Sequence, residues 1–181
     1  MSDQLIGLIC GIVHLVLSLV LALLATFGSF RIFDKLTRNI EEVDELKANN
    51  VSVSIVLAGM LLSSAIILKT VIHPAISTLQ TYLYQGVTWI SLLKAVGFIS
   101  GYIVLALALA IAAIWLAMRC FLVLTRNLDE LGEIKKDNTA VAIMLSTVIV
   151  IMGLFLAGGI DSLMKALIPF PAFEGIQVVT R

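Results

Sequence analysis

Few residues in this chain are of types that do chemistry, and they do not cluster. The chain has 2 histidines and 2 cysteines among 181 residues. His14 and His73 are too few for a metal site, because protein metal sites use three or four such ligands. Cys10 and Cys120 fall near opposite ends of two apolar stretches, too far apart for a disulfide. We therefore expect no catalytic residue, no cofactor, no metal and no enzymatic activity.

His14 is the one ionisable residue well inside an apolar stretch. Ionisable groups inside a membrane are functional candidates by default, and a proton relay is one interpretation. The other is structural: a neutral imidazole that bonds to a neighbouring Ser or backbone carbonyl and ties two helices together. Tyr102 occupies the equivalent position in the repeat described below. His14 and Tyr102 are therefore the candidate intramembrane polar residues.

A second group of candidates lies in two short charged segments of nearly the same sequence. Residues 33–40 read FDKLTRNI and residues 121–128 read FLVLTRNL. A merely solvated turn need not keep LTRN in both copies, so one interpretation is a docking surface for a cytoplasmic partner. The other is a solvated charged face with an apolar stripe against the bilayer or the other segment. The candidate docking residues are Arg38, Asn39, Glu42, Arg126, Asn127 and Glu130.

Each segment also carries the signals of a short helix. Asn39 and Asn127 each stand three residues before a Glu, the spacing of a capping box, which predicts a helix start. Asn50 and Asn138 should cap the helices that follow. Apolar positions three residues apart form one stripe per helix. The stripe consists of Ile40, Val43 and Leu46 in the first copy and Leu128, Leu131 and Ile134 in the second.

The elements that must position these residues are membrane spans. Hydrophobic residues make up 60% of the chain and charged residues 13%, whereas a soluble domain has about 25% charged residues. Four stretches lack Asp, Glu, Lys and Arg and are long enough to cross a hydrocarbon core of about 30 Å. They are residues 4–30, 48–68, 95–118 and 138–160. The sequence predicts an all-α integral membrane protein with four transmembrane helices, and its zero net charge does not favour nucleic acid as a partner.

The similarity of the two charged segments continues into the spans that follow. At a constant offset of 88 residues, Asn50 matches Asn138 and Val53 matches Val141 without an insertion. The chain is therefore interpreted as two tandem two-helix repeats of the same orientation, related by a pseudo-two-fold axis along the membrane normal. Gly7-xxx-Gly11 and Gly97-xxx-Gly101 begin the first span of each copy, which predicts close packing of the first and third spans.

The organisation predicted from these patterns has four parts. Repeat 1 covers 1–72, with spans at about 5–30 and 51–72 around a hairpin at 31–50; repeat 2 covers 95–163, with spans at about 95–118 and 139–160 around a hairpin at 119–138. Between them, 73–94 is an interfacial or re-entrant connection that begins where His73-Pro74 ends the second span. Residues 164–181 form a tail.

Charge predicts which side each part faces. Of the 12 Lys and Arg residues, eight lie in the two hairpins. The positive-inside rule therefore places the hairpins in the cytoplasm, and both termini and the connection outside.

The phrase F-x-x-L-T-R-N-[IL]-[ED]-E, followed by N-x-x-V-x-I-x-L, occurs in both copies. It resembles the YjfL-like family of bacterial inner-membrane proteins, domain-of-unknown-function family 350, over about 5–163. The resemblance implies four spans, the bacterial cytoplasmic membrane, and no assigned activity or catalytic residues. Members are associated with envelope-stress gene neighbourhoods.

The expected function is that of a non-enzymatic scaffold or sensor of the inner membrane. It would assemble in the lipid bilayer, as a homo-oligomer or with a cytoplasmic protein partner bound to the hairpins. The alternative is a small transporter or channel subunit whose pathway lies between repeats or protomers. A pathway needs polar groups near the midplane, and few residues are available for one. They are His14, Ser18, Ser63, Ser64, Ser100 and Tyr102.

Overall fold

The computed structural model describes residues 3–36, 42–125 and 129–167, and this part of the chain is entirely helical apart from short turns. Its helices are α1 (Asp3–Leu36), α2 (Glu42–Lys47), α3 (Val51–Lys69), α4 (Ile72–Tyr84), α5 (Trp89–Leu124), α6 (Glu130–Lys135) and α7 (Thr139–Ala166). By length and composition, 4 helical stretches of the described residues can cross a membrane: α1, α3 together with α4, α5, and α7. The prediction of an all-α chain with four long apolar helices is confirmed.

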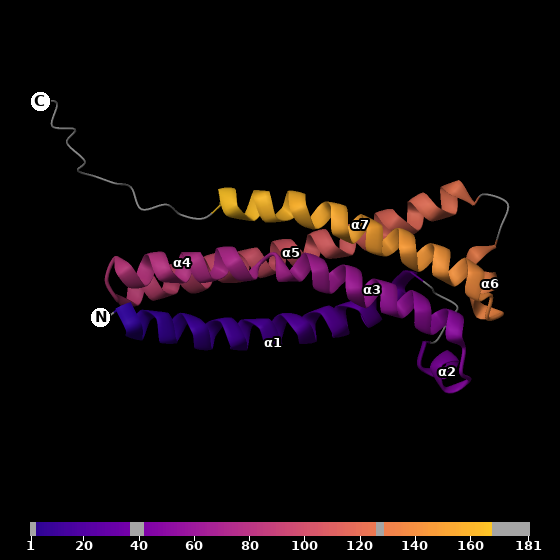
Figure 1. Cartoon of the computed structure of the whole chain (residues 1–181), viewed down its shortest axis with the longest axis horizontal. Coiled ribbons are helices and arrows are strands. Elements are labelled where there is room, and N and C mark those ends of the chain that lie inside the picture. Colours follow the sequence, from indigo (N-terminus) through magenta and orange to yellow (C-terminus); the bar gives the residue numbers. More distant parts are fainter. Residues whose placement is uncertain (1–2, 37–41, 126–128, 168–181) are drawn as a thin grey trace, which may run out of the picture.

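The helices form an elongated bundle with distinct ends (Figure 1). The short helices α2 and α6 lie at one end, and the N-terminus and the α4–α5 turn lie at the other. The α3–α4 stretch is the most enclosed, with 56% of its apolar window buried against 22–28% for the other three. The outer helices therefore present many apolar side chains outwards, as expected where lipid is the solvent.

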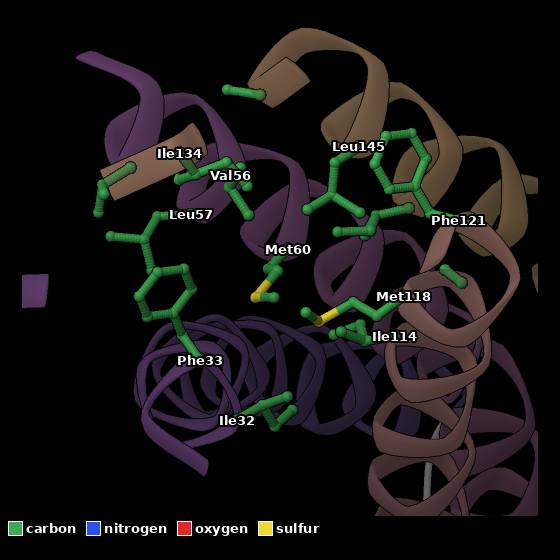
Figure 2. Close-up of a cluster of buried hydrophobic side chains, with 14 residues drawn as sticks. Ile32, Phe33, Val56, Leu57, Met60, Ile114, Met118, Phe121, Ile134 and Leu145 are labelled. Atoms are coloured by element: carbon green, nitrogen blue, oxygen red, sulfur yellow. The ribbon is translucent and has the colours of Figure 1, made fainter. Parts of the chain in front are cut away.

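Three apolar clusters of described residues lie along the length of the bundle. The cluster nearest α2 and α6 joins side chains of α1, α3, α5, α6 and α7, and Figure 2 shows Met60 and Met118 within it. A middle cluster joins the long helices around Ala106 and Ile67. The cluster at the far end joins α1, α4 and α5 around Cys10. Met60 and Met118 suit the first of these clusters, because the flexible side chain of methionine fills irregular gaps between helices.

The closest helix pair is α3 with α7, which both run from the hairpin end towards the far end. A Cβ added to Gly59 would lie 3.0 Å from Cα of Ser146, and one added to Gly153 would lie 3.0 Å from Cα of Ser63. Small residues therefore alternate across this contact and let the two backbones approach.

The expected close packing of the first and third spans through glycine is wrong. A Cβ added to Gly7, Gly11, Gly97 or Gly101 would meet nothing within 4 Å. These four glycines lie on exposed faces of α1 and α5, and the tight contact belongs to the second and fourth spans instead.

The second span breaks earlier than the proline predicts. α3 ends at Lys69, its cap residue Thr70 follows, and α4 begins at Ile72. Pro74 lies in the first turn of α4, where its missing N–H costs no helical hydrogen bond. α4 continues in roughly the direction of α3 and packs against α1 and α5 (Figure 1). Its depth in the bilayer stays a prediction.

Candidate functional site

At the hairpin end of the bundle, the second short helix, α6, begins two residues later than predicted. Asp129 is the N-cap residue of α6, and its side chain accepts a hydrogen bond from the backbone N–H of Gly132 at 3.3 Å. The predicted capping residue Asn127 lies outside the described residues, as does Asn39. Glu130 is therefore the first residue of α6 and not its third; its carboxylate accepts from the Thr125 hydroxyl, and the residue is only 5% exposed.

The turns that leave α2 and α6 have the same geometry. Asn49 and Asp137 hold equivalent positions with φ of 60° and 62°, a left-handed conformation that Asn and Asp tolerate better than most residues. The following residues also correspond. The Asn50 amide donates to Glu45 at 2.9 Å, and the Asn138 amide donates to Glu133 at 2.8 Å.

The start of α3 is held from both halves of the chain. Asn50 caps it as the sequence predicts, accepting from the N–H of Val53 at 3.0 Å. Asp137, from the turn after α6, accepts from the N–H of Ser52 at 2.8 Å. The Asn50 amide also donates to the carbonyls of Ile134 and Lys135, at 3.3 and 3.2 Å. By contrast, Asn138 occupies the N-cap position of α7 without a side-chain capping bond.

Two carboxylates in this region have pKa values below the ordinary value of their type. The hydrogen bond from the Ser52 N–H is the main cause of the lowered pKa of Asp137. The Asn138 amide, followed by the Lys136 ammonium, lowers the pKa of Glu133. Both groups are therefore anionic at neutral pH and hold the hairpin end together in that state.

The apolar stripes of the two short helices are buried to very different extents. Val43 and Leu46 of α2 are 55% and 37% exposed. Their equivalents in α6 pack into the core: Ile134 is 1% exposed, and Leu131 is partly buried against the same cluster. Figure 2 shows Ile134 beside Val56 and Leu57 of α3. The described part of the second stripe thus packs inside the chain, and Val43 and Leu46 of the first stripe remain exposed. Ile40 and Leu128 lie outside the described residues.

Of the six predicted docking residues, only Glu130 has a side chain that the structure describes. Arg38, Asn39, Arg126 and Asn127 lie outside the described residues. Glu42 is the first residue of α2. Burial removes the Glu130 carboxylate from the exposed surface, whereas Val43 and Leu46, the described residues of the α2 stripe, are exposed.

The two intramembrane candidates have different surroundings. Tyr102 is 3% exposed, and its hydroxyl donates to the carbonyl of Leu167 at 3.0 Å and lies 3.3 Å from the Thr78 hydroxyl. His14 is exposed and makes no hydrogen bond with any other residue that the structure describes, so the expected interhelical tie is not found. It lines a cavity of about 280 Å³ with Lys69 and His73.

Sequence reasoning missed two polar contacts. Ser29 and Ser64 are buried and 2.8 Å apart between their hydroxyls, which ties α1 to α3. Their spacing carries no signal, because Ser is common in membrane helices. The role of Asp137 as a cap of α3 was also missed. The available signal was that Asn and Asp, which tolerate a left-handed conformation, occupy the equivalent positions 49 and 137. No group of three or more His, Cys, Asp and Glu that could hold a metal occurs in the described ranges.

Comparison with known proteins identifies the family. The family model described as Domain of Unknown Function (DUF350) matches residues 6–101 and again residues 91–179. Two successive matches indicate an internal repeat, and together they cover nearly the whole chain. No curated protein and no solved structure matches it. With its four long apolar helices and these two matches, the chain is a membrane protein that belongs to the DUF350 family.

Proposed function

We propose that this protein is a multi-pass scaffold of the bacterial inner membrane that docks a protein partner on the exposed stripe of α2. The supporting observation is the unequal burial of equivalent residues: Val43 and Leu46 are exposed, whereas Ile134 is enclosed. An apolar stripe on a short helix in water gains free energy when a partner covers it. The excess of Lys and Arg in the hairpins supports a cytoplasmic partner.

Among the described residues, contacts between the second hairpin and α3 support the idea that the two hairpins have different roles. The second hairpin reaches the start of α3 through Asp137 and the backbone carbonyls of α6. In the proposed scaffold, the second hairpin stabilises the bundle through these contacts, and the first hairpin binds the partner through α2. A connection to envelope stress is part of the same proposal and is supported by the family resemblance alone.

Site-specific photo-crosslinking tests the docking role. A photoreactive residue at position 43 should capture a protein in native membranes, whereas one at exposed Lys47 on the same helix should capture much less. Mass spectrometry of the product names the partner, and a product of twice the chain mass would identify a second copy. Leu46→Asp should abolish the capture at position 43. Equal capture from both positions would contradict a docking surface.

The alternative, a transporter or channel subunit, has less support. Several polar side chains inside the described bundle bond to one another or to backbone carbonyls, as Ser29 and Ser64 do, and apolar clusters fill the space around them. A pathway between protomers would still give ion or solute flux in proteoliposomes. Flux above that of empty vesicles, lost in His14→Leu, would favour this alternative over the scaffold.

A further inference from the structure

A cavity of about 280 Å³ lies where α1 passes the joint between α3 and α4. Three basic residues, His14, Lys69 and His73, and two apolar residues, Ile72 and Ile76, line it. None of the three basic side chains makes a hydrogen bond or an ion pair with another residue in the described part of the chain. The ammonium and imidazole N–H groups that line the cavity therefore have no hydrogen-bond acceptor within the described part of the chain.

The repeat shows that this charge is particular to the first copy. At the offset of 88 residues, Lys69 corresponds to Ala157 and His73 to Asp161. Asp161 forms an ion pair of 2.6 Å with Lys165, so the second copy balances its charge internally. His14 corresponds to Tyr102 at the same offset. His14 is exposed, whereas Tyr102 is buried and hydrogen-bonded. The first copy therefore has basic residues around a cavity, where the second copy has an ion pair and a hydrogen-bonded tyrosine.

The length of α3 alone is compatible with a cavity in a headgroup layer, a depth that belongs to the proposal below. α3 has 19 residues from Val51 to Lys69, or about 28 Å at 1.5 Å per residue. The hydrocarbon core is about 30 Å thick. With the start of α3 at one boundary of this core, Lys69 reaches the other, where lipid phosphates lie. An unpaired cation is costly next to hydrocarbon, and an anion from the lipid would remove that cost.

We propose that this cavity binds the phosphate of an anionic lipid at the membrane surface opposite the hairpins. Lys69 and the two imidazoles donate to the phosphate oxygens, and Ile72 and Ile76 contact the glycerol and the first acyl carbons. The ammonium group of Lys69 disfavours a metal cation at the same place. The site is independent of the docking role of α2, because it lies at the far end of α3 from that helix.

Native mass spectrometry of the full-length protein in mild detergent tests the proposal. Phosphatidylglycerol should bind more tightly than phosphatidylcholine. The double variant Lys69→Gln, His73→Gln should weaken phosphatidylglycerol binding by about tenfold or more, the loss expected from removing charge-assisted hydrogen bonds. Lys94→Gln, which removes an exposed basic residue outside the cavity, should change the dissociation constant by less than about twofold.

Unchanged lipid binding in the double variant, or an equal loss in Lys94→Gln, would overturn the site. All three changed side chains are exposed, and an unaltered thermal midpoint without lipid shows that each variant is folded. His14→Gln gives a second, milder variant with the same expected direction. Inorganic phosphate is the second ligand to test, and it distinguishes a soluble phosphate from a lipid headgroup. If it raises the thermal midpoint of the wild type while phosphatidylglycerol does not, the cavity takes soluble phosphate and the lipid assignment is overturned.

Discussion

The carboxylate of Asp137 accepts a hydrogen bond from the backbone N–H of Ser52 at 2.8 Å, so the second hairpin caps the helix that follows the first. The first N–H groups of a helix have no partner within it, and an anion there also favours the positive end of the helix dipole. This contact joins the two halves of the chain at the end where α2 remains open.

Removing this cap should destabilise the fold. Asp137 has a φ of 62°, so Asp137→Gly keeps the turn and loses only the acceptor. We expect its thermal midpoint in detergent to fall by about 2–4 °C. Asp137→Asn is the control, because Asn tolerates the same φ and still offers an oxygen. If both variants melt together with the wild type, the cap contributes nothing.

Acid should weaken the same region. Hydrogen bonds lower the pKa values of Asp137 and Glu133 in the folded state. The unfolded chain then binds protons at a higher pH than the folded chain does, so the stabilisation is complete above the unfolded pKa of about 4 and is lost as pH falls through the folded pKa. Melting curves should show a decline beginning near pH 4, and Asp137→Asn should decline less. A midpoint that falls equally in both proteins would exclude Asp137 as the source.

Apolar composition and charge placement are sufficient to predict the spans, and the duplicated polar residues predict the repeat. They cannot predict which faces meet. Gly11 and Gly59 occur in equally apolar surroundings, yet only Gly59 lies against another helix. In water, polar residues would mark the outer face; in lipid, apolar residues cover both faces and the pattern disappears. The hairpins show a second limit, because Leu46 and Ile134 are equivalent by repeat and differ in burial through tertiary contacts alone.

The contact between α3 and α7 should not tolerate added volume. Gly59→Ala places its Cβ against Ser146, and one of the two helices must shift. We expect a loss of about 1–3 kcal/mol in the free energy of unfolding, measured by denaturant titration in mixed micelles. Gly28→Ala is the matched control, since a Cβ there meets nothing within 4 Å, and it should be neutral or stabilise by up to about 1 kcal/mol. Equal effects at both positions would refute the close approach.

Tyr102 should act as a structural tie across α4, α5 and the end of α7. Its buried hydroxyl donates to the Leu167 carbonyl and lies within hydrogen-bond distance of Thr78. Tyr102→Phe keeps the ring and leaves both partners without that bond, so the free energy of unfolding should fall by about 1–2 kcal/mol. Tyr84→Phe is the control because that ring is 63% exposed, and it should change stability by less than about 0.5 kcal/mol. A loss of the same size in both variants would mean that the Tyr102 hydroxyl has no special role. A loss confined to Tyr102→Phe would show that the Tyr102 hydroxyl stabilises the fold through its hydrogen bonds. His14, the equivalent residue of the first copy, is exposed and makes no such bond within the described residues.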